Sequence, residues 1–354
     1  MKSMLAAVYY GPKDLRVEKR PIPAIGPKEL LLRIDSASLC ATDFRIYDGS
    51  HRKFGPGTIR VPGHEMVGTI AELGQDVSGF AIGQRVFIAP NVGCGRCRQC
   101  LGGQNNLCPN YDAFGITLDG AFAEFMKVTA PAIEQGNVIP LPPDVDSAST
   151  ALSEPFACAL RGQDAVNVGE NDVVLILGAG PIGLMHVLLA RSRRARRIVI
   201  SDQTPDRLEK ARAFGAGRAV NFLREDVEGV VAEETRGEGA DVVIVATPVH
   251  KAQEQAPRLA AIGGRINLFA GLPKEQPTIE LNSNMVHYKE LIITGTTACS
   301  TRDCRRAVEL VTSGNIDLSG LISERLPLHK AGMAFDIARD GKHLKVVLQS
   351  GSTT

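Results

Sequence analysis

The sequence predicts an α/β protein of two domains, one β-rich and one built on a doubly wound parallel sheet. The chain has 354 residues, which exceeds the length at which a single hydrophobic core usually keeps growing. About the first 150 residues alternate short apolar runs with Gly, Pro and Asp turns, as in a compact β-rich domain. From about residue 172 onward, apolar strands instead alternate with helical segments, which is the pattern of βαβ units.

The predicted elements follow this division along the chain. In the β-rich part, the strand-like runs are LLLRIDSA, VGTIAEL and QRVFIAP. In the second part, the strand DVVLILGAG leads into the helical segment PIGLMHVLLARSR, and the strand RRIVISD leads into the helical segment TPDRLEKARAFGA. The strand ADVVIVAT, the helical segment HKAQEQAPRLAAI and the strands GRINLFAG and ELIITGTT follow. The tail adds the helical TRDCRRAVELVTSG, a strand at LISERLPL, the helical KAGMAFDIARD and the strand HLKVVLQ. We therefore expect one domain of residues 1–152 and 299–354, interrupted by a second domain of residues 153–298.

Composition and charge favour a globular protein that acts on small molecules. The chain is 44% hydrophobic and 22% charged, unlike a disordered chain. Lys and Arg (40) nearly balance Asp and Glu (39), so nucleic acid and anionic membranes are not expected partners. The basic run RSRRARR fits a solvated helix end better than a nucleic-acid contact. No run approaches the roughly 18 apolar residues of a membrane span, and the N-terminus lacks a signal-peptide core, so we expect a cytoplasmic protein.

A glycine-rich motif predicts a dinucleotide site. Gly178, Gly180 and Gly183 form G-x-G-x-x-G between an apolar strand and a helix, where backbone N–H groups and the helix end can receive a pyrophosphate. Asp202 ends the next strand 19 residues after Gly183, near the spacing at which a carboxylate accepts hydrogen bonds from the adenosine ribose. This carboxylate favours NAD over NADP, although Arg207 offers a contact for a 2′-phosphate.

Four clustered cysteines predict a closed metal site. Cys94, Cys97, Cys100 and Cys108 have the spacing C-x2-C-x2-C-x7-C on a glycine-rich loop. Four thiolates can saturate a tetrahedral zinc ion, and a site without an open position supports folding rather than catalysis. An iron–sulfur cluster is the alternative, which the longer spacing to Cys108 disfavours. A chain with eight cysteines and this cluster fits thiolate chemistry better than a disulfide framework.

A second set of metal-ligand types is scattered along the chain. It comprises Cys40 in LCATD, His64 and Glu65 in VPGHEMVG, and Glu154 in SEPFA. Taken singly, these are a small core residue, a turn pair and a helix cap. In this order, together with the cysteine loop and the glycine motif, they make the chain similar over essentially its whole length to the zinc-containing medium-chain dehydrogenases.

The resemblance implies a GroES-like catalytic domain, a Rossmann domain and two zinc ions per chain. GHE at 63–65 and EP at 154–155 look like the polyol (sorbitol or iditol) dehydrogenase branch, in which Cys40, His64 and Glu65 would hold the catalytic zinc, with Glu154 bound directly or through water. Thr42 resembles the family's hydroxyl that passes the substrate proton onward. The implied reaction transfers a hydride between a secondary alcohol of a polyol and NAD, in a homotetramer or dimer. The implied cofactor contacts are Gly178, Gly180, Pro181, Ile182, Gly183, Asp202, Arg207, Ala246, Ala270, Leu272 and Thr297.

Departures from the family pattern leave the substrate open. Arg45 stands where the animal sorbitol enzymes have a relay histidine, and the stretch 295–299 lacks their Arg-Tyr pair. Threonine dehydrogenases share GHE and EP but carry a histidine where this chain has Asn91. Butanediol and polyol-phosphate dehydrogenases have the same metal framework. Arg45, His51 and Arg52 are either phosphate contacts or, more simply, surface loop residues.

Two other classes compete with this interpretation. A zinc-free quinone reductase would use the same coenzyme fold, but it would not need the cysteine loop or the Cys40, His64 and Glu65 set. A non-catalytic NAD-binding scaffold would bind NADH and one zinc ion per chain and oxidise no alcohol.

Overall fold

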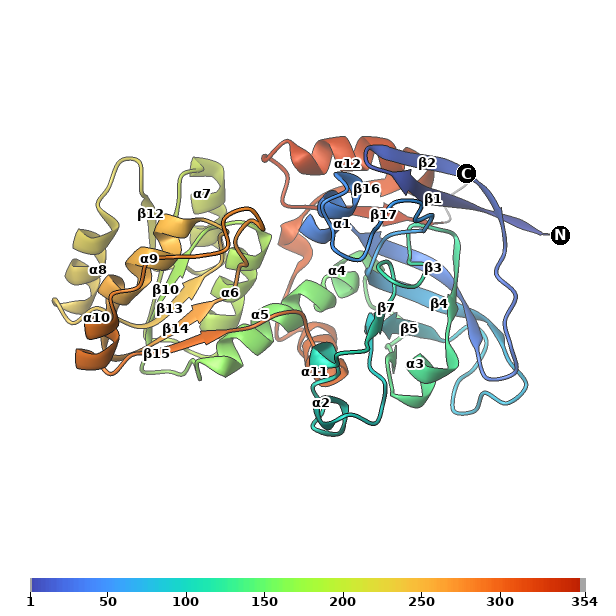
Figure 1. Cartoon of the computed structure of the whole chain (residues 1–354), viewed down its shortest axis with the longest axis horizontal. Helices are drawn as coiled ribbons and strands as arrows, with labels where there is room; N and C mark the ends of the chain where they lie inside the picture. The colour runs from blue at the N-terminus through green and yellow to red at the C-terminus, as the bar shows by residue number, and fades with distance from the viewer. Residues whose placement is uncertain (1, 351–354) are drawn as a thin grey trace. The chain divides into compact units, whose positions relative to one another are not determined.

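The computed structural model describes residues 2–350 and separates into two compact units. The first unit contains the residues up to 157 and those from 299 onward, and the second unit contains residues 158–298. Both units combine strands with helices (Figure 1), so the predicted α/β class is confirmed.

The first unit is built on a seven-stranded sheet. Its strand order is β16-β17-β3-β4-β5-β9, and β8 also pairs with β3. The strands are β3 (Leu30–Ser38), β4 (Glu65–Leu73), β5 (Arg85–Ile88), β8 (Phe125–Val128), β9 (Val138–Pro140), β16 (Ile322–Pro327) and β17 (Lys345–Gln349). Two small antiparallel sheets accompany it, formed by β1 (Ser3–Gly11) with β2 (Asp14–Pro21) and by β6 (Asn91–Val92) with β7 (Asp112–Ala113).

The helices of the first unit are short. They are α1 (Ala41–Tyr47), α2 (Arg98–Leu101), α3 (Ala130–Glu134), α4 (Ser147–Ala151), α11 (Thr301–Thr312) and α12 (Ala331–Arg339), with 3-10 turns at Asn105–Leu107, Ser319–Leu321 and Leu328–Lys330. The longer α5 (Ser153–Ala165) contains the boundary between the units. Ser300 begins α11 with a capping box, in which its side chain accepts from the Asp303 N–H and Asp303 accepts from the Ser300 N–H.

Strand pairing in the first unit brings distant sequence together. Leu30, Leu32 and Ile34 of β3 are fully buried in the core. The antiparallel register of β3 and β4 places Ser38 opposite Glu65, so the end of β3 meets the start of β4. On the other side of β3, β17 pairs antiparallel with it. Three chain segments therefore meet at one end of this sheet.

The second unit is a six-stranded parallel sheet with the order β12-β11-β10-β13-β14-β15. Its strands are β10 (Val173–Leu177), β11 (Arg197–Asp202), β12 (Arg218–Asn221), β13 (Ala240–Val245), β14 (Ala260–Leu268) and β15 (Ile292–Gly295). Its other helices are α6 (Pro181–Ser192), α7 (Pro205–Ala213), α8 (Val227–Thr235), α9 (His250–Leu259) and α10 (Ser283–Tyr288). The chain winds outward in both directions from β10, which confirms the doubly wound sheet and makes the end of β10 the expected ligand position.

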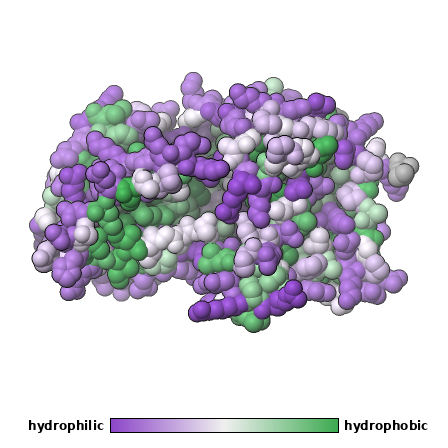
Figure 2. Space-filling view, viewed as in Figure 1, coloured by the Kyte–Doolittle hydropathy of each residue, from purple (hydrophilic) through white to green (hydrophobic). Residues whose placement is uncertain are grey.

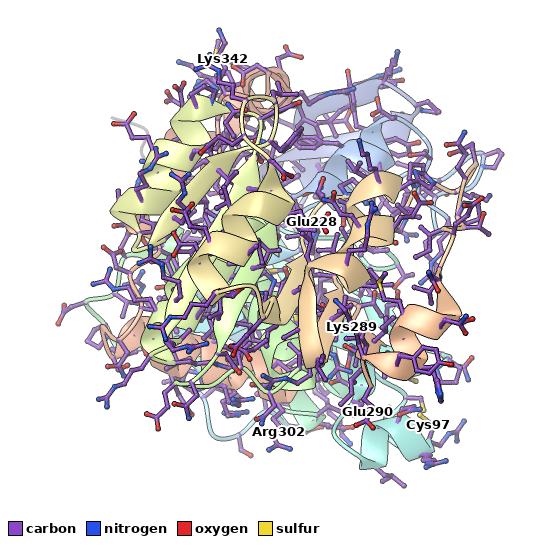
Figure 3. All side chains as sticks on the ribbon, turned by 90° about the vertical axis from the view of Figure 1, so that its left-hand side faces the viewer. Cys97, Glu228, Lys289, Glu290, Arg302 and Lys342 are labelled. Atoms are coloured by element: carbon purple, nitrogen blue, oxygen red, sulfur yellow. The ribbon has the colours of Figure 1, made fainter. Side chains whose placement is uncertain are left out.

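The predicted helix HKAQEQAPRLAAI is too long at its end. The structure ends α9 at Leu259 and starts β14 at Ala260. The ammonium group of Lys289 donates to the carbonyl oxygens of Pro257, Arg258 and Ala260, at 3.3, 3.2 and 2.7 Å (Figure 3 labels Lys289). A cation there satisfies carbonyl groups left without partners at a helix end. The signal for this end lies about 30 residues away along the chain, so the local pattern could not reveal it.

Candidate functional site

The four clustered cysteines converge in the first unit. The sulfur atoms of Cys94, Cys97, Cys100 and Cys108 all lie within 4.8 Å of one another. Cys97, labelled in Figure 3, is the N-cap of α2, and its sulfur accepts the backbone N–H of Cys100. Likewise, the Cys94 N–H points to the sulfur of Cys108 at 3.4 Å. The loop therefore folds so that its sulfur atoms face one point.

Backbone N–H groups favour the thiolate form at two of these cysteines. N–H groups of Arg96 and Cys97 lower the pKa of Cys94 to about 6, and the N–H of Cys100 lowers the pKa of Cys97. Burial instead raises the pKa of Cys100 to about 12, and the neighbouring Cys97 thiol adds to this. Without a metal ion, Cys100 therefore favours the thiol form, while Cys94 and Cys97 favour the thiolate form. A cation among the four sulfur atoms would favour the thiolate form at every one of them, since metal binding deprotonates thiols. The donor set fits a closed, four-coordinate zinc site.

The cysteine loop is tied to the rest of the first unit by a buried asparagine. The side-chain amide of Asn105 donates to the Asn91 carbonyl at 2.6 Å and accepts the Thr301 N–H at 2.9 Å. Asn105 thus connects the loop to the start of α11. A change in the cysteine loop should therefore affect the stability of this unit.

Cys40, His64 and Glu65 also converge in the first unit. Their ligand atoms lie within 4.8 Å of one another, and His64 and Glu65 are buried. Cys40 follows β3 and is the N-cap of α1, while Glu65 is the first residue of β4. The pairing of β3 with β4 therefore brings a cysteine and a histidine–glutamate pair together across 24 residues of chain.

A tight backbone turn delivers His64 to this position. Gly63 has φ +95°, and a Cβ atom there would lie 2.6 Å from the Phe122 ring. Only glycine adopts that conformation in so small a space without strain. The glycine of the GHE motif is thus explained by packing.

Asp43 orients two of these residues, and sequence reasoning missed it. Its Oδ2 accepts the Cys40 N–H at 2.8 Å, and its Oδ1 lies 3.6 Å from Nδ1 of His64. Burial alone would lower the pKa of His64, but Asp43 and Cys40 outweigh it and raise that pKa well above its usual value. A carboxylate behind a histidine is the usual second partner of a metal-ligating imidazole. The three donors and this partner fit a zinc ion with an open position.

Glu154 lies outside the 4.8 Å group of these three residues, although its carboxyl interacts electrostatically with His64 and Glu65. It is in the first turn of α5, is 6% exposed, and has Oε1 3.4 Å from the Cys299 sulfur. Burial raises the pKa of Glu154 to about 7; His64 opposes this shift and Glu65 adds to it. Thr42 is half-buried in the first turn of α1.

The glycine motif of the second unit lies where β10 meets α6. Gly178 has φ +103°, and Gly180 is the N-cap of α6 with open space where a side chain would be. A Cβ on Gly183 would lie 1.9 Å from the Gly178 carbonyl oxygen. Gly180 thus leaves room for a phosphate at the helix end, and Gly183 permits close packing of helix and strand.

Asp202 ends β11 beside this motif. Its Oδ2 accepts the Ala179 N–H at 2.7 Å and its Oδ1 accepts the Thr204 N–H at 2.9 Å. The carboxylate therefore supports the glycine-rich turn. The remaining predicted contacts, Pro181, Ile182, Arg207, Ala246, Ala270, Leu272 and Thr297, lie on α6, on α7 or just after strands β13, β14 and β15. The carboxyl ends of parallel strands form one edge of the sheet, which is where α/β proteins bind dinucleotides.

Comparisons with known proteins agree with this arrangement. The alcohol dehydrogenase GroES-like domain matches residues 26–143, and the zinc-binding dehydrogenase domain matches residues 181–313. The L-threonine 3-dehydrogenase of Chromobacterium violaceum is 36% identical over 333 residues, which are 93% of this chain and 94% of that protein.

Solved structures of similar proteins cover nearly the whole chain. A putative zinc-binding dehydrogenase of Sinorhizobium meliloti 1021, bound to NADP, has a TM-score of 0.90 and 31% identity, covering 99% of this chain and 100% of its own. An alcohol dehydrogenase of Escherichia coli CFT073, in complex with NADH, has a TM-score of 0.89 and 27% identity, covering 98% of this chain and 99% of its own.

Within residues 2–350, no helix is long and apolar enough to cross a membrane.

Proposed function

Because the chain belongs to the zinc-containing medium-chain dehydrogenases, which use zinc and NAD(P) to oxidise CH–OH groups, we propose that it oxidises a secondary hydroxyl of a small substrate with a second polar group on the neighbouring carbon. L-Threonine is the first candidate, and a polyol is the second. The main support for the proposal is that the ligand atoms of Cys40, His64 and Glu65 lie within 4.8 Å of one another.

The proposed catalytic centre uses this donor set. Cys40, His64 and Glu65 would hold zinc, and Glu154 would complete the set directly or through a water molecule. Zinc bound there polarises the substrate oxygen and lowers its pKa. Thr42, two residues after Cys40, would relay the hydroxyl proton away from the substrate, as the corresponding hydroxyl of the family passes it toward the cofactor ribose.

Several of the chain's own groups prepare this centre. Asp43 keeps the His64 ring and the Cys40 backbone in place through the contacts described above. Lys345 pairs with Glu65 and holds its carboxylate in one position. Positioned groups of this kind reduce the reorganisation needed during the reaction. The turn of Gly178, Gly180 and Gly183 would hold NAD, whose nicotinamide would supply the hydride acceptor.

Relatives support L-threonine as the substrate. Curated proteins 32–36% identical to this chain, over at least 92% of it, are L-threonine 3-dehydrogenases. The sequence counts against threonine at Asn91, where the resemblance to threonine dehydrogenases implies a histidine. Here the Asn91 amide donates to the Cys299 carbonyl at 2.9 Å, so this position has a structural use. Threonine and polyols both place a second polar atom next to the carbinol carbon, and both belong in the test.

We propose NAD as the preferred cofactor, because the Asp202 carboxylate at the end of β11 would repel a 2′-phosphate. Arg207 keeps NADP as the alternative. The four-cysteine loop would hold a second zinc that supports folding.

We also propose a homo-oligomer that works in the cytoplasm. Within residues 2–350, β15 pairs only with β14 and ends the sheet of the second unit, and Leu281, Tyr288 and Ile292 nearby expose large apolar side chains. Figure 2 shows apolar residues gathered on this face of the second unit. An exposed apolar edge strand favours pairing with a second copy. Since none of the cysteines forms a disulfide, a reducing compartment suits the chain.

The test is NADH formation by purified, zinc-loaded protein with L-threonine, polyols, butanediol and polyol phosphates, with zinc measured on the same sample. Turnover of L-threonine with two zinc ions per chain would support the leading candidate, and turnover of a polyol would support the second. Tight NADH binding with one zinc ion per chain and no turnover of any alcohol would overturn the proposal in favour of a scaffold.

A further inference from the structure

We propose that the segment from α1 to Phe54 forms an anion-binding subsite in the first unit, in which Arg45 and Arg52 bind a carboxylate or phosphate group carried by the substrate. This inference rests on the proposed function, because it assigns a substrate class to the site of Cys40 and His64.

Arg45 belongs to the helix that begins at the proposed metal site. Cys40 is the N-cap of α1, and Asp43, in the first turn, contacts both the Cys40 N–H and the His64 ring. Arg45 follows two residues later on the same seven-residue helix and is exposed. Arg45 therefore lies five residues after Cys40, a proposed zinc ligand, on the helix that Cys40 caps.

Hydrogen bonds fold the next segment back onto this helix. The N–H and the hydroxyl of Ser50 both donate to the Arg45 carbonyl oxygen, at 2.9 and 3.3 Å. His51 and Arg52 follow directly. Ser50, two residues before Arg52, is thus held against the backbone of Arg45.

An aromatic anchor fixes the end of this segment. Phe54 is 6% exposed, its N–H donates to the His51 carbonyl, and its ring lies edge-on to Tyr9 with 5.2 Å between centroids. The His51 ring packs on Phe54 at 5.6 Å. A packed segment loses less conformational freedom when it binds a ligand than a free loop does.

The two arginines lack protein counterions. Within residues 2–350, neither Arg45 nor Arg52 is in an ion pair, whereas Asp48 of the same segment pairs with Arg339 at 3.1 Å. Burial, together with the positive charge of Arg52 and of His64, lowers the pKa of His51 to about 4. Arg45 acts in the same direction and Asp43 opposes it. Both arginines therefore act on the His51 ring as nearby positive charges.

An anionic group suits this arrangement chemically. A guanidinium group binds carboxylate or phosphate through two parallel N–H bonds, and two of them can share one anion. The Lys53 N–H points to Nδ1 of His51 at 3.3 Å, which assigns the proton of the neutral ring to Nε2 and makes it a further donor. A neutral polyol would use none of this charge.

The experiment compares pairs of substrates that differ in one anionic group. Zinc-loaded wild type, Arg45→Gln, Arg52→Gln and the double variant are assayed with L-threonine against L-threonine amide, and with sorbitol 6-phosphate against sorbitol. Lys53→Gln is the matched control, because Lys53 is a neighbouring exposed cation with Nζ 5.4 Å from the Tyr111 ring. The dissociation constant of NADH is measured for each variant, and inorganic phosphate is titrated into each by calorimetry.

We expect the double variant to raise KM for the anionic member of the active pair about tenfold more than for its neutral partner, since charge-assisted hydrogen bonds are lost. The pair that the enzyme oxidises shows whether the subsite binds a carboxylate or a phosphate group. Equal changes for both members, or the same effect in Lys53→Gln, would overturn the subsite. Weaker NADH binding with an unchanged KM ratio would assign the arginines to the cofactor and also overturn it.

Failure of the proposed function is a separate result. If no alcohol is oxidised, the calorimetric titration with inorganic phosphate still tests whether the subsite exists. Phosphate binding that is lost in the double variant and kept in Lys53→Gln would support it, and no phosphate binding by the wild type would overturn it.

Discussion

Lys345 and Glu65 form a buried ion pair, with Nζ 2.6 Å from Oε2 and 2.9 Å from Oε1. Their side chains are 5% and 0% exposed. The same ammonium donates to the Leu39 carbonyl at 2.6 Å, next to Cys40. Burial would lower the pKa of Lys345, but the Glu65 carboxylate outweighs it and raises that pKa. One cation from the last strand therefore connects both segments that carry the proposed catalytic zinc ligands.

Replacing Lys345 with Met should destabilise the protein by about 3 to 5 kcal/mol, because Glu65 would remain buried without its partner. Denaturant unfolding of the chelated, zinc-free protein measures this loss, because a zinc ion at Glu65 would act as a second partner of the carboxylate. The double variant Lys345→Met, Glu65→Gln should recover part of it, since no buried charge is left. A loss below about 1 kcal/mol in Lys345→Met would show that another group compensates Glu65.

Cys40→Ala should remove one zinc ion per chain and abolish alcohol oxidation while NADH still binds. The expected dinucleotide contacts lie on the second unit, and Cys40 belongs to the first. Zinc content and NADH fluorescence titration on one preparation measure both effects. Retained turnover after loss of that zinc would contradict the assignment.

Cys94→Ser should act on stability instead. Loss of a closed metal site should lower the melting temperature by at least about 5 °C, since each kcal/mol corresponds to roughly 2–4 °C in a unit of this size. Zinc at Cys40 should remain, which distinguishes this variant from Cys40→Ala. An unchanged melting curve would mean that the cysteine loop does not support the fold.

Asp202→Ser should shift cofactor preference toward NADP by about tenfold or more, because the carboxylate that repels a 2′-phosphate is removed. Asp202 also accepts the Ala179 and Thr204 N–H groups, so Asp202→Asn is the control that keeps an acceptor and removes the charge. Both variants should shift the ratio of kcat/KM for NADP and NAD. If only the serine variant does so, the cause is distortion of the turn.

Glu154 should make the chelated protein less stable as pH rises from about 4.5 to about 7. Burial raises its folded pKa from 4.5 to about 7, so the native chain keeps a proton that the unfolded chain has already lost. The difference in unfolding free energy between wild type and Glu154→Gln should fall by at most about 3 kcal/mol across that window. Unfolding curves at several pH values measure it. A difference independent of pH would contradict this role for Glu154.

Local sequence patterns predicted much of the fold and part of the candidate site. The switch from period-two strands to βαβ units predicted the α/β class, because that periodicity reflects which faces are buried. The glycine motif and the four cysteines were visible for a similar reason. Each lies within 15 residues of chain, where backbone geometry limits how far apart the groups can be. In contrast, α5 was not among the predicted helices; polar residues such as Glu154 and Gln163 are buried together with its apolar ones, so the usual division into a buried apolar and an exposed polar face is weak.

By itself, the sequence determined the class of fold, the glycine turn and the cysteine loop, because short stretches of backbone govern each of them. Only the tertiary structure decided that Asp43 contacts His64, that Lys345 neutralises Glu65, and that α9 ends where Lys289 reaches it. Lys345 lies 280 residues from Glu65 along the chain. No local pattern specifies such a partner; the pairing of β17 and β4 with β3 brings the two charges together, and their mutual attraction offsets the cost of removing them from water.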